Sequence, residues 1–197
     1  STVFSGCIEK NPAPEGEGSS DIAVITESTA AETTAIPSSA DKLIALTYDD
    51  GPHSVHTEKI LDILEENGAT ATFFVVGYNI EKNINTIRRA QAIGCEIGNH
   101  TNDHKNLTKC NDKEIRTQVD LPNERILEHT DIEVTLFRAP GGSFKNVTDK
   151  IGMPLIQWSI DTEDWKAKDS AHKDRTEDER NAELRRIADN VVQSAEK

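Results

Sequence analysis

At residues 43–52 the chain reads Leu-Ile-Ala-Leu-Thr-Tyr-Asp-Asp-Gly-Pro, an apolar run that ends in two carboxylates and a turn. The part from Leu43 to Tyr48 has the length of a buried strand, and the Gly-Pro pair marks its end. Four similar runs follow at residues 72–76, 95–97, 134–137 and 155–160, and apolar residues at helical spacing occupy 60–64, 84–90, 115–127 and 184–192. This alternation predicts an α/β protein with a parallel sheet, either open or closed into a barrel.

The composition is that of an acidic globular protein of 197 residues with a formal net charge of −13 at pH 7. Binding to a phosphate backbone needs a surplus of Lys and Arg, so we expect no nucleic acid partner. The three cysteines, Cys7, Cys95 and Cys110, are too few for a disulfide framework. We expect Cys95 and Cys110 to be small buried apolar residues, and Trp158, which lies in the last predicted strand, to belong to the core.

The first 41 residues differ from the rest. Residues 8–41 consist largely of Ser, Thr, Ala, Pro, Gly and Glu, which predicts a disordered acidic tether ahead of a folded domain at 42–197. Val3-Phe4-Ser5-Gly6-Cys7 resembles the end of a bacterial lipoprotein signal, where the cysteine becomes lipidated. A chance Gly-Cys pair is the alternative. A lipid on Cys7 would give membrane anchoring, so we expect an extracytoplasmic protein of the bacterial cell envelope, or a secreted one.

Polar side chains follow four of the five predicted strands. Asp49 and Asp50 follow the first, and His100 and His104 the third. Two adjacent carboxylates repel each other unless a cation intervenes. Two histidines four residues apart face the same way if the backbone there is helical, and with one carboxylate they form a set suited to zinc or another divalent metal. The alternatives are an Asp-Gly-Pro turn and a structural histidine pair.

Taken in order, these groups resemble the first four motifs of the NodB-like polysaccharide deacetylases, carbohydrate esterase family 4. The matching segments are Thr47-Tyr48-Asp49-Asp50-Gly51-Pro52, His100 to His104, Arg138 to Gly142, and Asp161 to Trp165. The resemblance covers about residues 42–190. It implies a distorted (β/α) barrel and the metal-dependent hydrolysis of acetyl groups on a glycan.

The resemblance also implies roles for individual residues. It makes Asp50, His100 and His104 the ligands of one divalent metal ion, with zinc expected and cobalt or another transition metal as alternatives. It makes Asp49 the general base, Arg138 the group that holds this carboxylate, and Asp164 the group that orients a catalytic histidine. The backbone N–H of Gly141 would stabilise the oxyanion, and Pro140 and Trp165 would line the substrate groove.

The family's fifth motif, Leu-x-His, supplies the general acid, and none of the six histidines of this chain matches it. We therefore expect a fragment of a longer protein that lacks the closing strand of the barrel. The alternative is a naturally short member with impaired chemistry.

Peptidoglycan N-acetylglucosamine is the expected substrate, because a lipid-tethered enzyme faces the cell wall. Acetylxylan esterase and chitooligosaccharide deacetylase are the alternatives within the family. A non-catalytic glycan-binding module is the alternative of another class, but binding alone does not need a base such as Asp49 held by Arg138. We expect a monomer.

Overall fold

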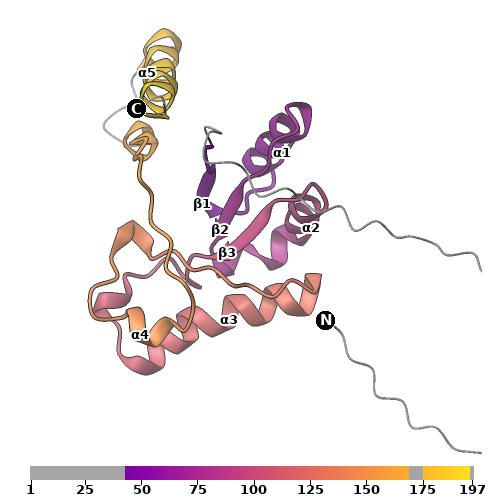
Figure 1. Ribbon diagram of the computed structural model, residues 1–197, viewed down its shortest axis with the longest axis vertical. Coiled ribbons are helices and arrows are strands. Elements are labelled where there is room, and N and C mark those ends of the chain that lie inside the picture. Colours follow the sequence, from indigo (N-terminus) through magenta and orange to yellow (C-terminus); the bar gives the residue numbers. More distant parts are fainter. Residues whose placement is uncertain (1–42, 169–174, 196–197) are drawn as a thin grey trace, which may run out of the picture. The chain divides into compact units, whose positions relative to one another are not determined.

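The computed structural model describes residues 43–168 and 175–195 (Figure 1). Its sheet has three parallel strands in the order β1 (Thr47–Gly51), β2 (Thr72–Val75) and β3 (Glu96–Asn99). Parallel bridges from Asn99 to Phe137 and from Phe137 to Leu155 continue the sheet beyond β3. The predicted α/β architecture with a parallel sheet is confirmed. The predicted boundary between residues 41 and 42 lies outside the described residues.

The first strand begins later than predicted. Leu43 and Ile44 are 70% and 54% exposed, and the ladder with β2 starts at Thr47, which pairs with Thr72. In the described residues β1 is paired along one side only, with β2. The backbone oxygen of Leu46 already accepts from the amide of Thr72 at 3.0 Å. An apolar sequence alone therefore does not make residues 43–45 part of the sheet, because a strand also needs a backbone partner.

The fourth and fifth predicted strands are shorter than expected. Residues 134–137 and 155–160 contribute only the two single bridges, at Phe137 and Leu155. The predicted core position of Trp158 is wrong, since this side chain is 38% exposed. The chain leaves the sheet after Leu155, so Trp158 is not covered on both faces as a central strand residue would be.

Helices occupy all four segments with helical spacing. They are α1 (His56–Glu66), α2 (Ile84–Ala92), α3 (Asp112–Thr130) and α5 (Glu177–Ala195), and a short α4 (Thr148–Ile151) follows α3. Single 3₁₀ turns form η1 (Gly77–Asn79), η2 (Glu81–Asn83), η3 (Leu107–Lys109), η4 (Pro140–Gly142) and η5 (Asp164–Lys168). A capping box fixes the start of α3, in which Asn111 and Glu114 exchange side-chain to backbone hydrogen bonds.

Two apolar clusters position the carboxyl ends of the strands. The first joins the sheet to α1 and α2 and includes Leu61, Phe73, Val75, Ile87 and Ile97. The second joins η3, α3 and α4 to the Phe137 bridge and includes Leu107, Ile115, Val119, Phe137 and Ile151. Since α3 also supplies Ile126 to the first cluster, it spans both and lies along one side of the sheet (Figure 1). Full burial of a large apolar side chain contributes about 1.5–3 kcal/mol.

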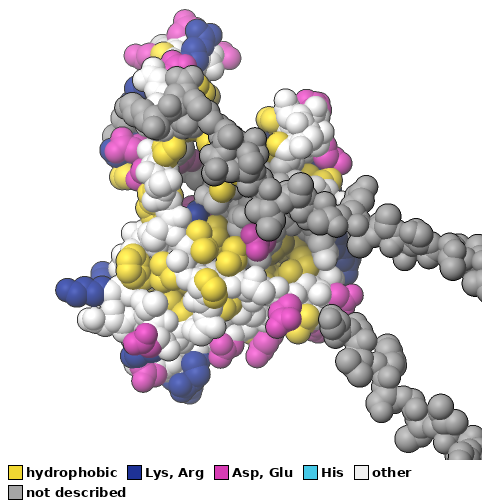
Figure 2. Space-filling model, in the orientation of Figure 1, with side chains coloured by type: hydrophobic (Ala, Val, Ile, Leu, Met, Phe, Trp, Pro, Cys, Tyr) yellow, Lys and Arg dark blue, Asp and Glu magenta, His cyan; other side chains and the backbone are white. Residues whose placement is uncertain are grey.

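The surface carries both charge and apolar area. Figure 2 shows hydrophobic side chains gathered on the face in view, with acidic and basic side chains around its edges. Leu184 and Val192 of α5 are each 59% exposed. Among the described helices, none combines the length and the apolar character that crossing a membrane requires.

Candidate metal centre

An irregularity in β1 directs its two carboxylates to different partners. The register with β2 shifts between Tyr48 and Gly51, and Asp50 has a left-handed backbone with φ 68°. A shift of this kind re-aims side chains at the end of a strand. The Asn79 side chain donates to the backbone oxygen of Asp50 at 3.2 Å, which ties η1 to this turn.

His100 follows β3 and is only 2% exposed. Its Nδ1 lies 2.8 Å from the backbone oxygen of Arg138. A carbonyl can only accept, so this contact places the hydrogen on Nδ1 and leaves the Nε2 lone pair free to bind a metal. Burial, the largest influence, lowers the pKa of His100 and so favours the neutral ring that a metal ion requires.

His104 lies close to His100, but the backbone between them differs from the predicted helix. The backbone between the two histidines is not helical, and Thr101 and His104 have left-handed φ angles of 68° and 55°. A loop with two such residues brings the rings together, with centroids 5.1 Å apart. Each non-glycine residue in this region costs of order 1 kcal/mol, so other contacts must hold the loop.

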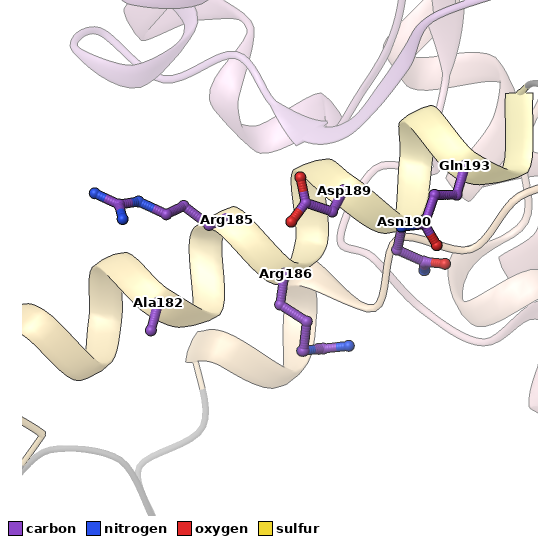
Figure 3. Close-up of a pocket in the computed structure, with 6 residues that line it drawn as sticks. All are labelled: Ala182, Arg185, Arg186, Asp189, Asn190 and Gln193. Atoms are coloured by element: carbon purple, nitrogen blue, oxygen red, sulfur yellow. The ribbon is translucent and has the colours of Figure 1, made fainter.

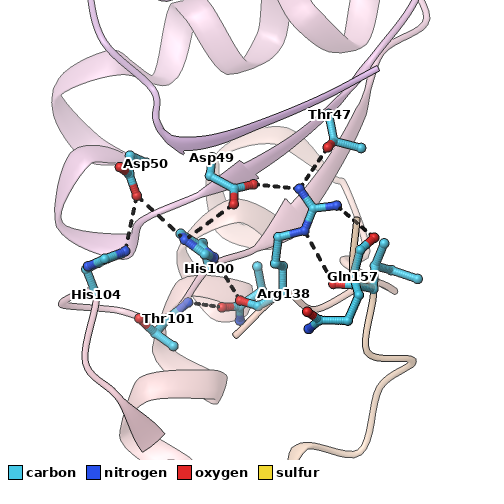
Figure 4. Close-up of polar contacts among 10 residues, drawn as sticks. Thr47, Asp49, Asp50, His100, Thr101, His104, Arg138 and Gln157 are labelled. Carbon is cyan, nitrogen blue, oxygen red and sulfur yellow. Dashed lines mark hydrogen bonds and ion pairs between the residues drawn. The ribbon is translucent and has the colours of Figure 1, made fainter. Parts of the chain in front are cut away.

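The side chains of Asp50, His100 and His104 converge at one point (Figure 4). Asp50 Oδ1 lies 3.2 Å from His104 Nε2 and 3.6 Å from His100 Nε2, and one ligand atom from each residue lies within 4.8 Å of the others. Two ligands of a tetrahedral zinc ion, each about 2.1 Å from it, lie about 3.4 Å apart. The spacing and the nitrogen/oxygen donor set therefore fit one divalent metal ion.

Asp49 lies beside this cluster and is held by a buried arginine. Arg138 is 2% exposed, and its Nη1 donates to Asp49 Oδ1 and to Thr47 Oγ1, both at 2.8 Å. Its other nitrogens donate to the backbone oxygens of Ile156 and Gln157, each at 3.3 Å. Asp49 Oδ2 lies 3.9 Å from His100 Nε2 (Figure 4). The arrangement leaves one carboxylate oxygen directed toward the cluster.

Gly141 and Pro140 follow Arg138 in η4. Pro140 is buried, and Gly141 has φ 60° with no heavy atom within 4 Å of the position that a Cβ would take. The described residues include no hydrogen-bond partner for the Gly141 N–H, whereas the amides of Gly142 and Ser143 both have one. The amide of Gly141 is thus an unpaired donor next to open space.

Asp164 and Trp165 are not tied to this cluster. Asp164 accepts from Thr162 Oγ1 at 2.8 Å, and Lys166 lies over the Trp165 ring at 5.3 Å. Within the described ranges, none of the hydrogen bonds, ion pairs or ring contacts of these two residues reaches the metal cluster or Asp49. Asp164 and Trp165, from the fourth motif, therefore share no described interaction with the residues of the metal cluster or with Asp49.

Several buried polar residues around the cluster were missed by sequence reasoning. Asn99 donates to the backbone oxygen of Val119 at 2.8 Å and accepts from the amide of Thr101 at 2.7 Å. Gln118 of α3 bonds to Asp103. The polar run at residues 99–104 was visible in the sequence, but nothing in it distinguishes Gln118 from an ordinary surface glutamine.

A hollow of about 630 Å³ lies elsewhere, on α5 (Figure 3). The residues that line it are Ala182, Arg185, Arg186, Asp189, Asn190 and Gln193. They recur every three to four residues along a single helix, and none belongs to the metal cluster. We therefore take the convergence of Asp50, His100 and His104, rather than this hollow, as the candidate functional site.

The chain is similar to known polysaccharide deacetylases. A family model described as polysaccharide deacetylase matches residues 37–154. The peptidoglycan-N-acetylglucosamine deacetylase PgdA of Listeria monocytogenes is 41% identical over 127 residues, which are 64% of this chain and 27% of the relative. A bifunctional xylanase/deacetylase of Pseudobutyrivibrio xylanivorans is 40% identical over 132 residues, 66% of this chain and 22% of the relative. Chitooligosaccharide deacetylases are also among the relatives.

The solved structures agree as well. The peptidoglycan deacetylase PdaC from Bacillus subtilis matches with a TM-score of 0.68 and 31% identity, over 78% of this chain and 70% of that one. This match confirms the predicted fold class. The chain spans only about a quarter of the length of the Listeria protein, at 27%.

Proposed function

The chain belongs to the polysaccharide deacetylase family, and we propose that it hydrolyses the N-acetyl groups of N-acetylglucosamine in peptidoglycan. One observation carries the proposal, namely that a carboxylate held by a buried arginine lies beside a cluster of one aspartate and two histidines. Peptidoglycan is preferred as the substrate because relatives at 41% identity and the matching structure at 31% identity are named peptidoglycan deacetylases.

We assign Asp50, His100 and His104 as the ligands of one divalent metal ion. Zinc suits a nitrogen/oxygen set of this kind, and cobalt is the alternative. A metal ion bound there would lower the pKa of a coordinated water and polarise the acetyl carbonyl. The Nδ1 contact of His100 with the backbone oxygen of Arg138 orients the ring and leaves Nε2 free, so that Nε2 would bind the ion.

Asp49 is our candidate for the general base. Its carboxylate is 32% exposed, so substrate and water can reach it, while Arg138 at 2.8 Å holds it in position. The attacking water would give its proton to Asp49 as its oxygen adds to the acetyl carbon. The amide of Gly141, which has no hydrogen-bond partner among the described residues, would donate to the oxyanion that forms.

The remaining site assignments stay proposals. Breaking the carbon–nitrogen bond requires a proton on the leaving nitrogen. Since no residue of the chain matches the family's general-acid motif, Asp49 would pass on to this nitrogen the proton that it takes from the water. Asp164 would orient a histidine, and Pro140 and Trp165 would line the groove. Trp165 is 59% exposed and hence available to a sugar ring.

An acetylxylan esterase is the second candidate, favoured by the relative that is a bifunctional xylanase/deacetylase. Acetate release from peptidoglycan, N-acetylated chitooligosaccharide and acetylxylan, measured in parallel with zinc or cobalt present, separates the candidates. We expect release from peptidoglycan, and none by the Asp49→Asn variant. Release from acetylxylan alone would refute our substrate assignment. Glycan binding without release on any substrate would indicate the non-catalytic module.

We further propose that the protein acts outside the cytoplasm, because its proposed substrate is the cell wall. We also propose that it is a monomer. Cys7, the residue expected to carry a lipid, lies outside the described residues. Membrane fractionation of wild type and Cys7→Ala tests the anchor, and light scattering on the purified chain tests the monomer. Wild type and Cys7→Ala found equally in the soluble fraction would contradict lipidation.

A further inference from the structure

The loop between the two histidines of the metal cluster is held from outside at each of its three residues, Thr101, Asn102 and Asp103. We propose that Gln118 of α3 is a positioning residue that keeps this loop in its metal-binding shape before any metal is bound. The proposal rests on the metal site proposed above. It assigns to α3, which contributes no ligand, a direct part in metal affinity.

The loop needs such support because its backbone is strained. Thr101 and His104, at its two ends, have φ angles of 68° and 55°. L-residues with a Cβ rarely adopt these angles, and they persist only where surrounding contacts enforce them. A relaxed loop would move His104 away from Asp50 Oδ1, which now lies 3.2 Å from its Nε2.

Gln118 forms two hydrogen bonds with Asp103, the residue that precedes His104. Its Oε1 accepts from the backbone N–H of Asp103 and its Nε2 donates to Asp103 Oδ2, both at 2.9 Å. The two bonds fix the backbone and the side chain of Asp103 together. Gln118 is 2% exposed, so water cannot readily replace either bond.

Asn102, the residue before Asp103, is also held by side-chain hydrogen bonds. Asn102 donates to Asp103 Oδ1 at 2.5 Å and accepts from Arg125 Nη1 at 3.0 Å. The same Arg125 nitrogen donates to the backbone oxygen of Gly77 at 3.2 Å. Gln118 and Arg125 lie seven residues apart, which places them on one face of α3, so one helix supports the loop at two points.

The backbone of Thr101 is held by hydrogen bonds as well. Its N–H donates to Asn99 Oδ1 at 2.7 Å and its backbone oxygen accepts from the amide of Gly77 at 3.0 Å. These bonds need no metal ion, so the loop is preorganised. The fold of α3 itself does not depend on Gln118, because its backbone bonds, its capping box and Ile115, Val119 and Ile126 stabilise it.

The test compares zinc and cobalt binding by calorimetry in wild type and Gln118→Leu, at fixed pH. We expect the Kd for both ions to rise about 10- to 100-fold, the range typical of losing a residue that supports the ligands of a metal ion from outside. In the metal-free protein we expect the amide of Asp103 to exchange its hydrogen faster. Gln118→Glu serves if Gln118→Leu does not fold, since it keeps the acceptor but sets a carboxylate oxygen against Asp103 Oδ2.

Two controls separate positioning from general stability. Ile115→Val removes one methylene from a fully buried residue one turn earlier on α3, and we expect a lower Tm with unchanged metal affinity. Gln91→Leu makes the same substitution at an exposed position on α2, and we expect no effect. Wild-type binding with an unchanged Kd in the Gln118 variant would overturn the positioning role alone. A wild type that binds neither ion would overturn the metal site and this role with it.

Discussion

Replacing Gly77 by alanine tests how tightly the metal-binding loop is packed. A Cβ on Gly77 would lie 2.5 Å from Asn102 Oδ1, 2.9 Å from Asn102 Cα and 3.0 Å from Pro122 Cγ. Carbon atoms at optimal separation are about 3.5–4.0 Å apart, so relieving the clash with the backbone of Asn102 alone requires a shift of more than about 0.5 Å. Asn102 lies between His100 and His104, so this shift moves the ligand loop.

We expect two measurable consequences. Overpacking of this kind costs about 1–3 kcal/mol, which denaturant unfolding of the metal-free protein will show. The displaced loop should also bind zinc about 10- to 100-fold more weakly, a loss of about 1.4–2.8 kcal/mol that calorimetry measures directly.

Gly68→Ala provides the matched control. Gly68 follows α1 with φ 59°, and no heavy atom lies within 4 Å of its would-be Cβ. Alanine there costs about 1 kcal/mol through backbone strain alone. We therefore expect a similar loss of stability with no change in zinc affinity. Unchanged affinity in Gly77→Ala, or an equal loss in both variants, would refute the reasoning.

Three further predictions concern charged groups. Arg138→Met leaves the Asp49 carboxylate and two backbone oxygens without their hydrogen-bond donor. We therefore expect the free energy of unfolding to fall by about 3 kcal/mol. A fall below about 1 kcal/mol would contradict the role of Arg138 as a buried donor. Asp50→Ala should abolish zinc binding, whereas Asp49→Asn should keep it and lose turnover; full activity of Asp49→Asn would rule out the base. Hydrogen bonds from the Thr86 hydroxyl and, second in effect, from Arg89 lower the pKa of Glu58 from its usual 4.5. The ionised Glu58 carboxylate therefore stabilises the fold above pH 4.5, and this stabilisation is lost as the pH falls through the lowered pKa. Urea unfolding of wild type and Glu58→Gln should therefore differ by up to about 1 kcal/mol at pH 7 and converge in acid, and a constant difference would count against the linkage.

The order of the motifs pointed to residues that lie together in the structure. Asp50, His100 and His104 do converge, and Arg138 does hold Asp49. The physical reason given for the histidine pair was wrong, since a strained loop rather than a helix brings the rings together. Residue types and their spacing can therefore indicate which side chains converge even when the local backbone conformation is predicted wrongly.

Other features depended on packing that no local pattern records. Trp158 lies in an apolar run yet is exposed, because the chain has left the sheet by then. Gln118 is a polar residue among apolar neighbours on α3, and its two bonds reach Asp103, 15 residues earlier in the chain. Whether such a residue is solvated or buried and paired depends on which segment packs over it.

The sequence by itself determined the alternation of strands and helices, the acidic charge and the residues available as ligands and base, because these follow from side-chain chemistry and periodicity. Only the tertiary structure decided which of these residues meet and what holds them. Hydrogen bonds are directional and short-ranged. The bonds from Arg138 to Asp49 and between Gln118 and Asp103 therefore form only once α3, β1 and the chain after β3 are packed together.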